Sequence, residues 1–243
     1  RAHVQWDAVV AALRTAGAEV EVLDPVEGLP DLVFTANAGI VHGDRFVPAR
    51  FRNPERQGEE AVNEAWFAGH GWRVDHLPVD LPHEGAGDAL PFRDELVCGH
   101  RWRTDARAHV ALACVTGATT RLVVLADERL YHLDMTFCPL DERRAMVTPG
   151  AYEPAGWELL RTFVPERIEL RLDEALALTA NAVVVGTTIV MTACPPRVGR
   201  RLEAWGFHVV VVDVSEFVKA GGGVRCLTLA LDVRLGSPPA GDG

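Results

Sequence analysis

Residues 31–50, DLVFTANAGIVHGDRFVPAR, contain two short apolar stretches on either side of a polar HGD turn. Short apolar runs separated by turn residues are typical of a β-hairpin. A helical stretch at 54–71 and an extended stretch at 72–79 follow this hairpin. The order of elements predicts a unit of two strands, a helix and a third strand, abbreviated ββαβ.

The same order recurs along the chain, which is the signature of a repeat architecture. Three further units contain a hairpin, a helix and a strand, at 84–127, 132–173 and 181–214. A fifth begins with GGGVRCLTLALDV at 221–233. The period is roughly 42 to 50 residues, because the unit starts lie near Phe34, Glu84, His132, Asn181 and Gly223.

Five such units predict an α/β fold that closes into a ring, a five-bladed pseudosymmetric α/β propeller of ββαβ repeats with helices outside and strands around a central channel. The fifth unit stops early, because 234–243 is rich in Gly, Pro and Ser, and the strand expected at 19–24 has no hairpin before its helix. We therefore expect the chain ends to be adjacent and to complete one unit together. We also expect that an N-terminal strand missing from this sequence pairs beside residues 226–232. The whole of 1–243 is expected to form a single domain.

Composition narrows the range of partners. The chain has 24 basic and 34 acidic residues, a formal net charge of −10, and no run rich in Lys or Arg. This balance argues against a nucleic-acid partner and suits a cationic small molecule. No stretch approaches about 18 consecutive apolar residues, and the start lacks a signal peptide, so we expect a cytoplasmic protein that does not enter a membrane.

The cysteines indicate free thiols. Their number is odd, and none has the C-x-x-C spacing of a zinc site, so we predict no metal. Four of them lie within or at the ends of expected helices and strands, and we assign them structural roles: Cys98, Cys114, Cys138 and Cys194. The fifth, Cys226, follows three glycines, where another group can approach the backbone closely.

Polar residues gather at the unit starts, which a ring brings together. A cysteine thiolate at Cys226 is a candidate nucleophile, and His132 is a candidate proton shuttle because its ordinary pKa lies near neutrality. The carboxylates of Glu84 and Asp134 could hold a planar cation such as a guanidinium by paired hydrogen bonds. The remaining polar residues at these starts are Asn37 and Asp88.

Each of these residues alone also fits a structural role. A single cysteine or histidine commonly belongs to the core, and EGAGD at 84–88 fits a turn capped by its aspartate. Their common phase in the repeat favours the functional interpretation.

Four motifs resemble those of the guanidine-modifying, or amidinotransferase-like, superfamily. They are FTAN (34–37), EGAGD (84–88), HLD (132–134) and GGGVRC (221–226), and together they extend over almost the entire chain. This superfamily includes arginine deiminases, dimethylarginine dimethylaminohydrolases, amidinotransferases and arginine dihydrolases. The resemblance implies the same five-bladed propeller that the repeat predicts.

The resemblance also implies a reaction. Cys226 would attack the guanidinium carbon to form a covalent thiouronium, while Glu84 and Asp134 bind the guanidinium nitrogens. His132 would protonate the leaving group and then activate water. No cofactor is implied, because the guanidinium carbon is already electrophilic and the reaction is not a redox reaction.

Further substrate contacts follow from the resemblance alone. Arg56 and Arg103 would bind the substrate carboxylate, and Asp31 and Asp88 would belong to the substrate site. The expected partner is thus a small guanidino molecule, and the sequence leaves open whether the chain forms a homodimer.

Asn37 bears on the substrate. Deiminases have a carboxylate at this motif position, whereas a neutral amide can both donate to and accept from a neutral ureido group. FTANAG at 34–39 is most similar to the arginine dihydrolases, which release ammonia, carbon dioxide and ornithine. We predict that activity. A deiminase or dimethylarginine dimethylaminohydrolase giving citrulline, an amidinotransferase, and a non-catalytic guanidino-binding protein are the alternatives.

Overall fold

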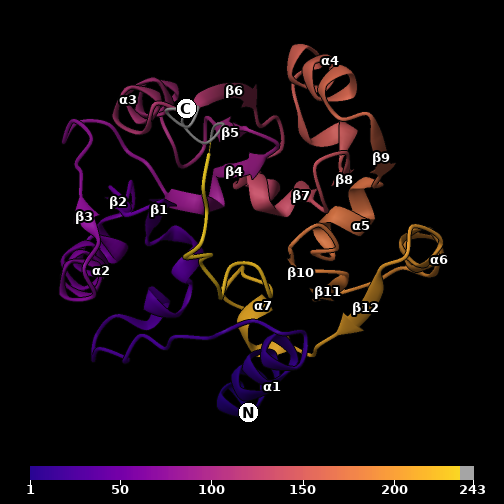
Figure 1. The fold of residues 1–243 in the computed structure, drawn as a ribbon, viewed down its shortest axis with the longest axis horizontal. Coiled ribbons are helices and arrows are strands. Elements are labelled where there is room, and N and C mark those ends of the chain that lie inside the picture. The colour runs from indigo at the N-terminus through magenta and orange to yellow at the C-terminus, as the bar shows by residue number, and fades with distance from the viewer. Residues whose placement is uncertain (236–243) are drawn as a thin grey trace, which may run out of the picture.

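The structure, a computed structural model, describes residues 1–235 and contains four three-stranded sheets (Figure 1). The strands of the first two sheets are β1 (Gly39–His42), β2 (Arg45–Pro48), β3 (Arg73–Val74), β4 (Ala89–Phe92), β5 (Glu95–His100) and β6 (Thr119–Val124). Those of the other two are β7 (Phe137–Pro139), β8 (Arg144–Val147), β9 (Glu166–Glu169), β10 (Ala182–Val185), β11 (Thr188–Met191) and β12 (His208–Val211).

One helix crosses between the second and third strands of each sheet. These helices are α2 (Gly58–Gly69), α3 (Ala106–Thr116), α4 (Pro154–Phe163) and α6 (Pro196–Ala204). The others are α1 (Ala2–Thr15) and the short α5 (Leu172–Leu176) and α7 (Ser215–Val218). The ββαβ order predicted for the first four units is therefore observed, and α5 and α7 are additions to it.

The pairing within each sheet follows from its connections. The first two strands of a sheet are antiparallel and the third is parallel to the second, because the helix returns the chain to the same end of the sheet. Tight turns join β1 to β2 and β10 to β11, where Gly43 has φ 61° and Gly186 has φ 57°. Glycine adopts this backbone conformation at little steric cost, which explains the polar Gly turns of the sequence.

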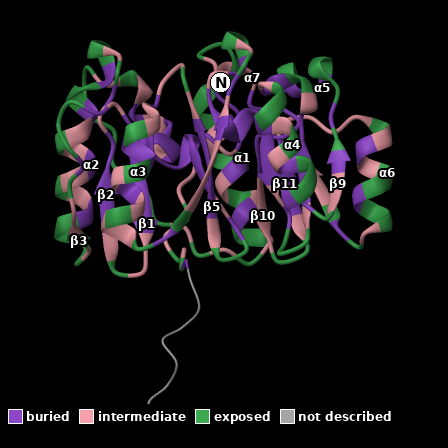
Figure 2. Ribbon diagram, turned by 90° about the horizontal axis from the view of Figure 1, so that it is seen from above, coloured by how far each residue is buried: buried purple, intermediate pink, exposed green. Residues whose placement is uncertain are grey.

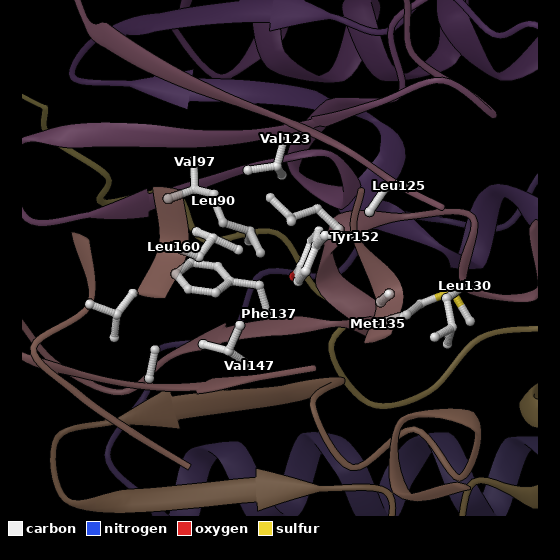
Figure 3. Close-up of a cluster of buried hydrophobic side chains, with 14 of the residues drawn as sticks. Leu90, Val97, Val123, Leu125, Leu130, Met135, Phe137, Val147, Tyr152 and Leu160 are labelled. Atoms are coloured by element: carbon white, nitrogen blue, oxygen red, sulfur yellow. The ribbon is translucent and has the colours of Figure 1, made fainter. Parts of the chain in front are cut away.

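Hydrophobic clusters fill the spaces between neighbouring sheets. The largest joins the β4–β6 sheet to the β7–β9 sheet and includes Leu90, Val97, Phe137, Val147 and, from α4, Leu160 (Figure 3). Strands β1, β2, β4, β5, β8 and β11 are largely buried, and the helices expose their outer faces (Figure 2). In Figure 1 the five longer helices, α1, α2, α3, α4 and α6, lie at the periphery, with α1 between α2 and α6.

The two ends of the chain depart from the sequence prediction. Residues 19–24 and 226–232, both expected as strands, are not strands in the structure. In the second segment Leu227 and Thr228 donate backbone hydrogen bonds to residues three positions earlier, which makes turns instead of an extended chain. Residues 1–235 thus contain four sheets, whereas the sequence predicted five blades. The predicted adjacency of the two chain ends involves residues 236–243, which lie outside the described residues.

None of the helices in residues 1–235 combines the length and apolar character needed to cross a bilayer.

Candidate active site

Three short 3₁₀ turns contain or directly flank five of the nine predicted site residues: Asn37, Glu84, Asp88, His132 and Asp134. The turns are Thr35–Asn37, Gly85–Gly87 and Leu133–Met135, and each directly precedes the first strand of a sheet. The first and third of them both contact the Gly85–Gly87 turn. Gly85 has φ 61°, and a Cβ there would lie 2.7 Å from the Gly39 oxygen, so only glycine lets these turns approach. We expected the polar residues at the unit starts to lie in strands, whereas in the structure they lie in or beside these turns.

A cavity of about 260 Å³ lies where the unit starts meet. It is lined by six residues that the sequence singled out, namely Asp31, Asn37, Arg56, Arg103, His132 and Cys226. The candidate nucleophile and the candidate proton shuttle, 94 positions apart by residue number (226 − 132), therefore face the same space. This is the arrangement that the repeat predicts.

His132 forms a buried ion pair with Glu84. Its Nε2 lies 2.8 Å from Glu84 Oε2, and Arg103 donates to the same oxygen over 3.3 Å. Burial alone would lower the pKa of His132, but the carboxylates of Asp88 and Glu84 raise it above its usual range. Burial would raise the pKa of Glu84, yet the contacts with His132 and Arg103 lower it. Both groups are thus held in their charged forms.

The Cys226 sulfur lies between a carboxylate and an amide. Its thiol donates to Asp134 Oδ2 over 3.6 Å, and Asn181 Nδ2 lies 3.1 Å away. Burial, and then the Asp134 carboxylate, raise the pKa of the Cys226 thiol. The sulfur is therefore a thiol in the absence of a bound cation.

Beside Cys226 and His132, two buried carboxylate oxygens have no hydrogen-bond partner among the described residues. They are Glu84 Oε1 and Asp134 Oδ1. An unpartnered buried acceptor costs about 1–3 kcal/mol or more when charged, so such a site favours a ligand that donates hydrogen bonds. A planar cation with several N–H groups fits two such acceptors.

Arg56 lines the cavity with its guanidinium already engaged. Arg56 is buried, with 7% of its surface exposed, and forms an ion pair with Glu59 over 2.8 Å. It also donates hydrogen bonds to Asn37 Oδ1 over 2.9 Å and to the Asp31 carbonyl over 3.2 Å. Asn37 in turn donates to the Glu84 carbonyl over 3.1 Å. The structure thus shows Arg56 orienting the Asn37 amide; the predicted contact of Arg56 with a substrate carboxylate remains a proposal.

Asp88, like Glu84 and Asp134, is not among the residues that line the cavity. Its carboxylate accepts from Thr104 Oγ1 over 2.6 Å and from the Leu133 backbone N–H over 3.0 Å. Burial raises the pKa of Asp88 to about 6. These contacts hold the Leu133–Met135 turn beside His132, so the geometry gives Asp88 a positioning role rather than the predicted place in the substrate site.

Sequence reasoning missed two residues of the site. Tyr131 lines the cavity, donates to the Gly221 carbonyl over 2.8 Å and has the Arg103 guanidinium 4.6 Å from its ring centre. Asn181, fully buried, contacts the Cys226 sulfur. Asn181 opens the fourth unit, so its phase in the repeat, the signal used for the other unit starts, would have found it.

Comparison with known proteins identifies relatives over nearly the whole chain, although no family model matches it. The chain is 41% identical over 233 residues to the bifunctional arginine dihydrolase/ornithine cyclodeaminase AgrE of Nostoc sp., which covers 94% of this chain and 33% of AgrE. The chain therefore spans about a third of that relative's length. It is 37% identical to the N(G),N(G)-dimethylarginine dimethylaminohydrolase of Mycobacterium tuberculosis, covering 95% of this chain and 76% of that enzyme.

Solved structures agree with these relatives. The N-terminal domain of ArgZ, a cyanobacterial arginine dihydrolase, has been solved covalently bonded to a reaction intermediate; it matches with a TM-score of 0.94 and 37% identity, covering 97% of this chain and 88% of that domain. The fold is thus that of the N-terminal domain of ArgZ. The chain belongs to the guanidine-modifying superfamily, which confirms the resemblance found in its four motifs.

Proposed function

We propose that this chain hydrolyses the guanidinium group of free L-arginine through a covalent intermediate on Cys226, as an arginine dihydrolase. The overall reaction consumes one arginine and two waters and yields ornithine, carbon dioxide and two ammonia molecules. One observation carries the proposal. Cys226 and His132 face one cavity, beside which two buried carboxylates each have an oxygen without a partner.

The first half of the reaction uses the charge of the substrate. A guanidinium held by Glu84 and Asp134 places a positive charge beside the sulfur, and an adjacent cation favours the thiolate over the thiol, so the thiol proton is released to solvent when the substrate binds. The Cys226 sulfur then attacks the guanidinium carbon. One C–N bond breaks, and the ammonia leaves with a proton from His132, giving a thiouronium bound to the enzyme.

The second half consumes water. His132, now neutral, removes a proton from a water molecule that attacks the thiouronium carbon. The C–S bond breaks, the electron pair returns to sulfur as a thiolate, the remaining hydroxyl proton is released to solvent, and a neutral ureido group remains on the substrate. A second round on this ureido group releases another ammonia and leaves a carbamate, which decomposes to ornithine and carbon dioxide.

Asn37 supports the second round in this proposal. Its amide oxygen accepts one hydrogen bond from Arg56 and its nitrogen donates one to the Glu84 carbonyl. An amide offers two donors and two acceptor sites, so one of each remains for a ligand. A neutral ureido group can use both, whereas a carboxylate in this place could only accept.

Hydrolysis of a methylated arginine to citrulline is the second candidate function. The similarity to the dimethylarginine dimethylaminohydrolase of Mycobacterium tuberculosis, over 76% of that enzyme, favours it. The two candidates share the covalent step and differ in the amine that leaves and in the number of rounds. An amidinotransferase would differ in using an amine in place of water.

The products distinguish these functions. The protein is incubated with arginine, with methylated arginines and with arginine plus glycine, and ammonia, ornithine and citrulline are measured. Ornithine with two equivalents of ammonia from arginine supports the dihydrolase; citrulline alone overturns it in favour of the second candidate. Cys226→Ser should abolish turnover and the covalent adduct detected after acid quenching, whereas Cys114→Ser, at an exposed cysteine, serves as the matched control. Full activity of Cys226→Ser would reject the nucleophile.

We also propose that the two ends of the chain fill the place of a fifth blade. Each cluster between neighbouring sheets contains residues from one outer helix, as α3, α4 and α6 illustrate. Val9 and Leu13 of α1 share a corresponding cluster with Val190 of β11 and with Leu227 near the other end. Helix α1 thus packs as the other outer helices do, although no strands accompany it within residues 1–235.

A further inference from the structure

The orientation of the Asn181 amide is fixed by the backbone around it. Its Oδ1 accepts hydrogen bonds from the Arg225 and Cys226 N–H groups, over 2.9 and 3.3 Å. Its Nδ2 consequently faces the other way, 3.1 Å from the Cys226 sulfur and 3.4 Å from the Asp134 carbonyl. Exchanging the two ends of the amide would set donor against donor on one side and acceptor against acceptor on the other.

An amide nitrogen can only donate, so the sulfur is the acceptor in this contact. A hydrogen bond donated to sulfur stabilises the thiolate more than the thiol, because the thiolate carries the negative charge. Asp134, on the other side of the sulfur, acts in the opposite direction by charge repulsion. The hydrogen bond from Asn181 therefore offsets part of the rise in the Cys226 pKa that the Asp134 carboxylate causes, while that carboxylate stays available to bind the substrate cation.

We infer that Asn181 is a further catalytic residue, whose side-chain amide donates a hydrogen bond to the Cys226 thiolate when it attacks and again when it leaves. The inference rests on the proposed function for its place in a reaction. The repeat supports it independently, because Asn181 stands at the start of the fourth unit, as Asn37 and His132 stand at the starts of theirs.

Thr192 supplies a matched control. Its hydroxyl accepts a hydrogen bond from the Val224 backbone N–H over 3.0 Å, so it holds the same turn that Asn181 holds. No contact joins it to the sulfur among the residues that the structure describes. Thr192→Val thus weakens the support of the turn and keeps the donor to sulfur, whereas Asn181→Asp keeps an acceptor for the turn and removes that donor.

The experiment measures the rate at which iodoacetamide alkylates Cys226 against pH, by peptide mass spectrometry without substrate. Asn181→Ala should raise the midpoint by about 1 to 2 pH units, the value expected for losing one hydrogen bond to a charged group. Asn181→Asp should raise it further, because its carboxylate adds a like charge beside the sulfur. Thr192→Val should leave it within about 0.3 units. In turnover, the Asn181 variants should lower kcat by about 10- to 100-fold and change KM less.

An unchanged midpoint in both Asn181 variants, or an equal shift in Thr192→Val, would leave Asn181 only a role in holding the turn and overturn the inference. Circular dichroism shows whether each variant is folded. If one Asn181 variant fails to fold, the midpoint measured for the other tests the inference. Because the alkylation needs no substrate, a raised midpoint in a protein that releases no ammonia would reject the proposed function and keep the contact between Asn181 and the thiolate.

Discussion

At the scale of single residues, the pairing of Glu84 with His132 sets the protonation state of the cavity. Burial by itself favours the neutral forms of both groups, yet the contacts between them shift both in the opposite direction. The result is a buried imidazolium beside a carboxylate, which in the proposed reaction would supply the proton for the first leaving ammonia. The pair is therefore both a structural and a chemical feature of the site.

Glu84→Gln tests this pair through its pH dependence. We expect kcat to fall by about 10²- to 10⁴-fold, the usual contribution of a positioned acid–base group. The first step needs protonated His132, so the rate of thiouronium formation falls as the pH rises through the folded-state pKa of His132. The glutamine removes a charge that raises this pKa. The descending limb of the single-turnover rate against pH should therefore move to lower pH.

The same variant tests the stability of the pair. A histidine with a raised pKa stabilises the fold fully below its unfolded pKa, and this contribution disappears as the pH rises through the folded value. The lowered pKa of Glu84 adds stability that disappears at the acidic end. The loss of Tm in Glu84→Gln should hence be larger at about pH 6 than at about pH 9. Equal losses at both pH values would contradict a charged pair, and Glu153→Gln, in an exposed ion pair with Arg101, is the control.

At the scale of elements, the three glycines before Cys226 are explained by what their missing side chains would meet. Gly221 has φ 90°, and a Cβ there would lie 2.6 Å from the Tyr131 hydroxyl. A Cβ on Gly222 would overlap the Phe34 ring, and one on Gly223 would lie 2.7 Å from Asn181 Oδ1. The turn can therefore approach the cavity wall only because all three residues are glycine.

Gly223→Ala should displace this turn from Asn181. Because the turn carries the sulfur, we expect a loss of kcat of at least about tenfold, as is usual when a reacting group is misplaced. Gly69→Ala is the matched control, since a Cβ there meets nothing within 4 Å and alanine favours the helix. Turnover and thermal unfolding of the two variants check the prediction, which fails if both retain wild-type kcat.

The elements also mark the limit of what the sequence could predict. Hairpins and helices were predictable, because turn residues such as Gly43 and Gly186 separate apolar runs at a regular period. The 3₁₀ turns were not, because residues such as Ala36 and Leu133 continue the apolar pattern of the strand that follows. What bends them is contact with turns from other units, which local sequence does not carry.

The site was predictable to the same extent. Because His132 and Cys226 occupy equivalent positions in their repeat units, the sequence predicted that they meet, and both line one cavity in the structure. It could not show that Arg56 is already paired with Glu59, or that Asp88 accepts a hydrogen bond from Thr104. The direction of a side chain depends on partners that are distant in the sequence.

At the scale of the whole molecule, the head of the chain supports the residue proposed as nucleophile near its tail. Leu13 of α1 is 5% exposed and shares one hydrophobic cluster with Cys226 and Leu227. Gln5 donates to Ser215 over 2.9 Å and accepts from the Glu216 N–H over 2.9 Å, which docks α1 on α7. The packing of the sulfur therefore depends on a helix that begins more than 200 positions earlier.

Leu13→Ala tests this dependence. Removing a buried leucine costs about 2–5 kcal/mol, and each kcal/mol lowers Tm by about 2–4 °C in a domain of this size. Leu202→Ala in α6 is the matched control, because Leu202 is also buried and lies in a cluster that does not contain Cys226. We expect similar losses of Tm, but faster alkylation of Cys226 below the unfolding transition in Leu13→Ala alone, since Leu13 belongs to the hydrophobic cluster that contains Cys226. Equal alkylation rates in the two variants would mean that α1 supports the fold without supporting the nucleophile.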